Sequence, residues 1–292
     1  MFHFIFNKVK MSKVRSNNRI TLLPITGFPE LSINEEIVMQ NTIDKIKRIY
    51  KQFGFVPLET RLVELDTILK QKGIDNKELY CLNKTYNDEV FEANEEQRKL
   101  ALRFDLTVPM ARYIGQNQMD MSFPFKRYQI QKVYRAEDSK TKRGRFNEFY
   151  QCDIDVIGRD KLDLAYDSEI PSIIYNIFNN VFNISNFILR VNNRKLLEGL
   201  FMENGLNDVT RIKRAVKIID DIEKVDRSLT ITRLQEIGME EEVANKLLEL
   251  FKTVFDMEGD LAIRHLQEQN FEGSLIKEGI EELEKVVNGI IA

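Results

Sequence analysis

The segment from Phe123 to Gly158 constrains the fold of this chain more than any other stretch. Two β-like runs flank a polar, basic loop there, and that loop extends from Asp138 to Gly144. Such a composition between two apolar, alternating runs is typical of a hairpin connection. We therefore predict that the two runs are neighbouring strands of one sheet.

Alternation along the second run sends successive side chains to opposite faces of that sheet. One face is apolar apart from Glu148 and carries Phe146, Tyr150, Cys152, Ile154 and Val156. The opposite face carries Arg145, Asn147, Phe149, Gln151, Asp153 and Asp155. The first run delivers Arg135 to the same neighbourhood, with Glu137 just beyond it. A polar face of this kind is costly to build for packing alone, so we predict a binding site there.

A further strand is predicted from Lys99 to Val108, because apolar and polar residues alternate along it. Its buried face would hold Leu102, Phe104, Leu106 and Val108, and its charged face Arg103, Asp105 and Thr107. Pro109 would then open a helix from Met110 to Asn117, since proline suits the first helical turn.

Upstream, Ser32 and Glu35 form a capping box that opens a helix ending at Gly54. Phe55 to Leu58 reads as a short strand, and Pro57 places it at an edge because proline lacks a ladder donor. Val63 to Lys72 is predicted to be a short helix.

The remainder of the chain becomes progressively helical. We expect a helix over 163–181, a strand over 187–192 and a helix over 194–204. From about residue 208, five amphipathic helices follow, over 212–225, 229–237, 240–255, 261–269 and 275–287. The predicted organisation is an N-terminal extension (1–26), an α+β core with an antiparallel sheet flanked by helices (27–207), and a small helical module (208–292). Either Met1 or Met11 could be the start.

The composition is that of an ordinary soluble chain, with 43% hydrophobic and 30% charged residues among 292. The net charge of -3 gives no general nucleic-acid footprint, so contact with RNA would require local basic patches. Cys81 and Cys152 lack CxxC spacing and are predicted to be reduced core or near-core thiols, without a zinc site or disulfide. We find no signal peptide and no membrane span, and expect a cytoplasmic protein.

Familiar catalytic motifs do not occur. The sequence contains no phosphate loop, no GxGxxG, no GxSxG and no nucleophile paired with a base. Its two histidines, His3 and His265, lie in the tail and in the helical module. What remains is a charged strand surface suited to a zwitterion and a polyphosphate, since arginine presents a planar fork to phosphate or carboxylate oxygens.

Two stretches resemble the histidyl-tRNA synthetases, a class II aminoacyl-tRNA synthetase family, and most closely their eukaryotic-like type. They are Leu102–Pro109 (LRFDLTVP) and the segment from Tyr134 to Asp155, which looks like the family's motif 2. Glu35 to Pro57 is similar to motif 1, the dimer-forming helix and strand. Val191–Arg194 and the helical module are similar to the linker and insertion domain.

The resemblance implies that histidine is activated with ATP and transferred to tRNA(His). Asp105, Thr107 and Gln151 would hold the histidine ammonium, and Asp155 would face its imidazole. Arg135 would be catalytic at the α-phosphate, Glu137 and Arg145 would contact ATP, and Phe149 would stack on adenine. Mg²⁺ would bridge the phosphates, no protein-built metal site is expected, and the family implies a homodimer.

Each residue also has a structural interpretation. Arg135 and Glu137 could form a solvated pair, Asp105 could cap a turn, and Phe149 could be ordinary core. The basic hairpin tip Lys140, Lys142 and Arg143 could be solvated or could contact the tRNA acceptor end.

The resemblance also implies segments that do not occur before Ala292: a histidine-specific RGLDYY-like segment, motif 3 and an anticodon-binding domain. Three hypotheses therefore stay open. The chain is a truncated or split histidine–tRNA ligase, a histidine-binding regulatory paralogue like the regulatory subunit of ATP phosphoribosyltransferase, or a dimerising interaction module. Retention of the ATP-contacting residues favours the first.

Overall fold

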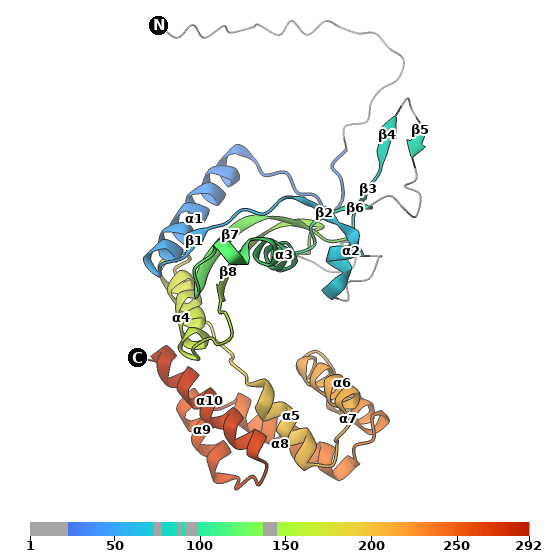
Figure 1. Cartoon of the computed structure of the whole chain (residues 1–292). Coiled ribbons are helices and arrows are strands. Elements are labelled where there is room, and N and C mark those ends of the chain that lie inside the picture. Colours follow the sequence, from blue (N-terminus) through green and yellow to red (C-terminus); the bar gives the residue numbers. More distant parts are fainter. Residues whose placement is uncertain (1–22, 73–77, 87–88, 92–98, 137–144, 292) are drawn as a thin grey trace, which may run out of the picture. The chain divides into compact units, whose positions relative to one another are not determined.

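The computed structural model describes residues 23–72, 78–86, 89–91, 99–136 and 145–291. The chain divides into two compact units. The first contains residues up to Ser32, Arg61–Met110 and Gln131–Gln151. The second contains Ile33–Thr60, Ala111–Ile130 and the remainder from Cys152. Both strands and helices are present, so the predicted α+β class is confirmed (Figure 1).

The two β-like runs are neighbouring strands, as predicted. One sheet has the order β1-β7-β8, with β1 at Val56–Pro57, β7 at Phe125–Tyr134 and β8 at Glu148–Ile157. Strand β1 runs parallel to β7 and is an outer strand of this sheet, which agrees with the edge position expected from Pro57.

Helices α1 (Ile33–Gln52) and α4 (Ala165–Asn180) pack on the apolar face of this sheet. The buried cluster there consists of Ile46, Ile49, Tyr50, Phe55, Tyr128, Ile173 and Ile177. Ile154 and Val156 pack against it, so the apolar face expected for the second run is confirmed at these two residues, whereas Phe146 and Cys152 are exposed. Helix α1 ends where predicted, because Gly54 adopts φ +79°, a conformation that favours glycine.

The first unit contains a second, antiparallel sheet with the order β2-β6-β3. Its strands are β2 (Val63–Leu65), β6 (Leu100–Leu102) and β3 (Cys81–Leu82), and β4 (Lys84–Tyr86) pairs with β5 (Glu89–Phe91). The helix predicted from Val63 is wrong in its first turn. The backbone of β2 pairs with β6 there, and only then do α2 (Asp66–Leu69) and the 3-10 helix η1 (Lys70–Lys72) follow.

The strand predicted over 99–108 is also too long. Strand β6 ends at Leu102, and helix α3 (Thr107–Asn117) has already begun at Thr107, followed by the 3-10 helix η3 (Gln118–Asp120). Arg103 and Asp105, expected on an open face, are both buried. Arg103 donates from Nε to the Lys132 carbonyl of β7 at 2.8 Å, so this hydrogen bond holds its side chain in the interior.

The C-terminal helices of the second unit form one packed module (Figure 1). They are α5 (Arg194–Glu203), α6 (Val209–Asp220), α7 (Arg227–Glu236), α8 (Glu241–Phe255), α9 (Gly259–Glu268) and α10 (Ser274–Ile291). All were predicted to within a few residues. The strand predicted over 187–192 is not formed, because these residues pair with no strand of the described chain. Among the described helices, none combines the length and apolarity needed to span a bilayer.

Candidate functional site

Arg135 directly follows β7 and is fixed by a reciprocal contact with Asn147. The Arg135 amide donates to the Asn147 carbonyl at 2.8 Å, and Asn147 Nδ2 donates to the Arg135 carbonyl at 2.7 Å. Asn147 is buried, so this side chain lies inside the fold although it was expected on an open face. The backbone on both sides of the hairpin loop is thereby tied together at the residue expected to be catalytic.

The Arg135 guanidinium contacts two other predicted site residues, Gln151 and Phe149, and also Phe104. Its Nη2 donates to Gln151 Oε1 at 3.2 Å, and its Nε donates to the Phe104 carbonyl at 3.3 Å. Its central carbon lies 4.5 Å from the Phe104 ring centroid and 5.1 Å from that of Phe149. Cation–π contacts and hydrogen bonds therefore hold the guanidinium in one place. The Arg135 side chain is half-buried, whereas the alternative of a solvated pair with Glu137 is not tested, because Glu137 lies outside the described residues.

Asp105 and Thr107 lie at the start of α3. Asp105 Oδ1 accepts from the Val108 amide at 3.0 Å, so this carboxylate caps the helix, one of the two interpretations kept open from the sequence. Thr107 is the first residue of α3 and is half-buried. The Phe104 carbonyl that accepts from Arg135 precedes Asp105 directly, which brings the backbone of this turn to the guanidinium.

Asp155, near the end of β8 in the second unit, is paired with an arginine that the sequence analysis missed. Arg127 Nη2 lies 2.6 Å from Asp155 Oδ2, and the Arg127 side chain is fully buried. Arg127 Nη1 donates to Gln129 Oε1 at 3.2 Å. Period-two alternation along the first run would have found both residues, since Arg127 and Gln129 share one face of β7.

Glu148, the charged exception on the apolar face, has a partner of its own. Its Oε1 lies 2.6 Å from Lys132 Nζ, and this hydrogen bond raises the pKa of Lys132 above its ordinary value. Pairing explains how a charge is accommodated on a face that otherwise packs against helices.

The other predicted residues are less informative. Glu137 and the basic hairpin tip lie outside the described residues, and Arg145 is exposed.

Cys81 and Cys152 are free thiols, but both are exposed, so their expected core positions are wrong. Within the described residues, no three His, Cys, Asp or Glu side chains gather into a group that could hold a metal ion.

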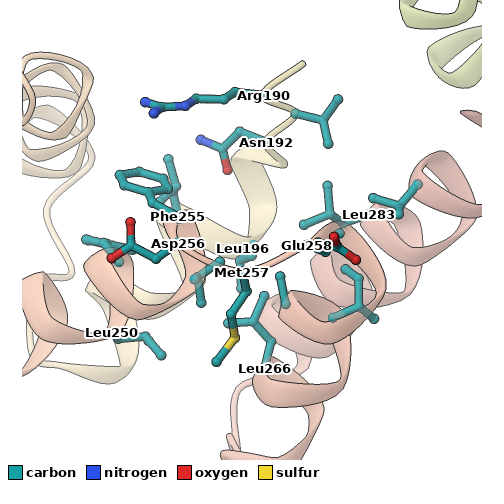
Figure 2. A pocket seen from close by; sticks show the side chains of 18 of the residues that line it. Arg190, Asn192, Leu196, Leu250, Phe255, Asp256, Met257, Glu258, Leu266 and Leu283 are labelled. Carbon is teal, nitrogen blue, oxygen red and sulfur yellow. The ribbon is translucent and has the colours of Figure 1, made fainter. Parts of the chain in front are cut away.

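A pocket of about 410 Å³ lies elsewhere, in the helical module. Figure 2 shows its mostly apolar lining, with Arg190, Asn192, Asp256 and Glu258 as its polar members. None of the predicted site residues lines this pocket. The strand surface and the helical pocket are therefore separate features of the molecule.

Comparisons with known proteins agree on one family. The family model described as histidyl-tRNA synthetase matches residues 27–291. The histidine–tRNA ligase of Clostridium tetani is 41% identical over 272 residues, which cover 92% of this chain and 57% of that protein. The corresponding ligase of a Nostoc species is 37% identical over 283 residues, which cover 94% of this chain and 60% of that protein.

Solved structures extend the likeness to three dimensions. The crystal structure of histidyl-tRNA synthetase from Nostoc superposes with a TM-score of 0.78 at 35% identity, over 94% of this chain and 58% of that one. A Bacillus halodurans structure titled ATP phosphoribosyltransferase regulatory subunit/histidyl-tRNA synthetase has a TM-score of 0.74 at 17% identity, over 94% and 66%, and shows the fold alone. The chain thus spans 57–60% of the length of these curated relatives.

Proposed function

The chain belongs to the histidyl-tRNA synthetase family, and from this premise we propose that it activates histidine with ATP for transfer to tRNA(His). The proposal covers the activity, the substrates and the partners of the whole protein. The observation that supports it most is the set of contacts around one arginine: Arg135 contacts Gln151, the Phe104 carbonyl and the Phe149 ring at once. A guanidinium held in this way is pre-organised for an anionic phosphate.

In the proposed reaction, a carboxylate oxygen of histidine attacks the α-phosphorus of ATP, and the bond to the leaving pyrophosphate breaks. Negative charge develops on the α-phosphate oxygens during this step. Arg135 would stabilise that charge without itself reacting, so positioning and electrostatics supply the catalysis. Arg145 and Glu137 would bind ATP beside it, and the Phe149 ring would stack on adenine.

Histidine would be held by the remaining predicted residues. Asp105, Thr107 and Gln151 would receive its ammonium group, and Asp155 would receive its imidazole. Gln151 and Asp155 lie four residues apart on β8, and side chains at this spacing share one strand face. Asp105 would have two roles, because its carboxylate would bind the ammonium group and also caps α3.

Mg²⁺ would arrive as its ATP complex, since this ion commonly keeps its waters and binds through substrate phosphates. The partners would be tRNA(His) and a second copy of the chain in the cytoplasm. We also keep the division into an α+β core (27–207) and a helical module (208–292) as part of the proposal.

The test is histidine-dependent exchange of pyrophosphate into ATP. We expect exchange with the unmodified chain and a loss of about 100-fold or more with Arg135→Ala, the scale observed when a transition-state donor is removed. Lys132→Met is the matched control, because Lys132 lies three residues earlier and pairs with Glu148 on the other face. Its exchange rate should stay near that of the unmodified chain.

Two other results would contradict catalysis. If histidine raises the melting temperature without ATP while no exchange occurs, the chain is a histidine-binding regulatory protein. If histidine changes neither the melting temperature nor the exchange rate, the interaction-module hypothesis replaces both.

A further inference from the structure

The ion pair of Arg127 and Asp155 is asymmetric. The Arg127 side chain has 0% exposure, whereas that of Asp155 has 25%, and their Nη2 and Oδ2 atoms lie 2.6 Å apart. Burial of a guanidinium is unfavourable unless it is paired with an anion. Asp155 provides that anion, and its side chain is the partly exposed member of the pair, although the Oδ2 atom itself is buried.

The buried end of the pair is itself held in place. Arg127 Nη1 donates to Gln129 Oε1 at 3.2 Å, and Gln129 Nε2 donates to Thr60 Oγ1 at 3.1 Å. Gln129 and Thr60 are both buried. The contacts Thr60–Gln129, Gln129–Arg127 and Arg127–Asp155 thus lead from three buried residues to a half-buried carboxylate, and each member restricts the rotamer of the next.

We propose that Arg127 is a positioning residue, which orients the Asp155 carboxylate toward the imidazole of bound histidine. This inference rests on the proposed function, which assigns the imidazole to Asp155. An ionised carboxylate accepts hydrogen bonds and donates none, so it selects a ring that presents an N–H. Arg127 thereby contributes to the preference for histidine over a ring of similar shape without that donor.

The experiment measures this preference in the full chain by calorimetry. The two ligands are L-histidine and β-(2-thienyl)-L-alanine, whose five-membered ring lacks an N–H. We expect Arg127→Met to lower the ratio of the two affinities by about tenfold or more, as when a buried polar group loses its partner. Arg127→Lys, which keeps a cation, should retain part of the preference.

A double-mutant cycle with Asp155→Asn separates positioning from general damage. If Arg127 acts through Asp155, adding Arg127→Met to Asp155→Asn should cause little further loss of the preference. Lys126→Met is the matched control. Lys126 is the preceding residue and pairs with Glu169 at 2.6 Å, so its loss should lower stability without changing the ratio.

The possible results distinguish failure of the inference about Arg127 from failure of the proposed function. If the unmodified chain does not prefer histidine, the proposed function and this inference fall together. If it does, and Arg127→Met weakens both ligands equally or neither, only the inference is overturned, since Arg127 is then merely structural. If Arg127→Met does not fold, Arg127→Lys decides by the same ratio.

Discussion

Lys126 and Arg127 are adjacent on β7, yet they occupy opposite surroundings. Lys126 faces the helices, where it pairs with Glu169 and lies 4.9 Å from the Phe55 ring centroid. Arg127 faces the polar side and is fully buried against Asp155. Strand alternation predicts that their faces differ. Both side chains are cationic, so residue type alone does not decide which of them is buried. That depends on the side chains that the fold places against each one.

Cys152 provides a prediction at the scale of one residue. Desolvation by surrounding atoms, with a smaller contribution from the Asp153 charge, raises the pKa of its thiol from 9.0 to about 11. The exposure of Cys152 to solvent favours reaction of its thiol, whereas the raised pKa disfavours that reaction. We expect the pKa to dominate, because each pKa unit changes the thiolate fraction about tenfold and the thiolate is the nucleophile.

In a Cys81→Ser variant, Cys152 should therefore react with iodoacetamide about 100-fold more slowly at pH 8 when the chain is folded than when it is unfolded. The rate in the folded chain should keep rising with pH toward about 11. Equal rates in the folded and unfolded chain would show that the thiol is not perturbed.

At the scale of elements, helices were predicted better than short strands. The helices of the C-terminal module carry their own period, and glycines with positive φ end two of them, at Gly205 and Gly238. A strand forms only beside a partner strand, because its backbone hydrogen bonds are made with another segment of the chain. Thus β2 appears where a helix was expected, and the strand expected over 187–192 is not formed.

The packing of α5 on α10 gives a prediction at this scale. A Cβ added at Gly279 would lie 2.4 Å from the Leu196 amide nitrogen, which is backbone and cannot rotate away. Gly279→Ala should therefore destabilise the chain by about 1–3 kcal/mol, the usual cost of overpacking. The change in free energy of unfolding is measured by urea denaturation.

Gly115 in α3 is the matched control for that experiment. An added Cβ there would meet nothing within 4 Å. Gly115→Ala should instead stabilise the chain by about 0.5–1 kcal/mol, because glycine loses more freedom in a helix than alanine. Equal effects at Gly115 and Gly279 would contradict the close approach of α5 and α10.

At the scale of the whole molecule, the apolar residues left exposed on α1 favour association. Ile33, Ile37 and Val38 are 81%, 55% and 65% exposed in the N-terminal half of the helix, while Ile46, Ile49 and Tyr50 in its C-terminal half are buried against the core. Exposed apolar patches of this kind commonly mark interfaces, and a symmetric dimer uses one patch twice. This supports the proposed homodimer through the predicted motif 1 helix.

The chain should therefore sediment as a homodimer. Ile37→Glu combined with Val38→Glu should raise the dimer dissociation constant by about 100-fold or more, because both copies would bury unpaired charges. Met119→Glu is the control, since Met119 is 82% exposed outside α1 and its substitution should leave the dimer intact. A monomeric unmodified chain, or a dimer insensitive to both α1 charges, would refute this interface.

The sequence by itself determined the family, the α+β class, the neighbouring strands around residues 123–158 and the helical module. These depend on local periodicity and on long motifs, which are properties of consecutive residues. Only the tertiary structure decided that Asp105 caps α3, that Arg135 joins Gln151 to Phe104, and that Arg127 lies buried behind Asp155. The contacts of Arg135 and Arg127 join residues far apart in the chain, and a side chain's partner there depends on how the strands and turns pack. The Asp105 cap is local, and the sequence had already offered it as one of two interpretations.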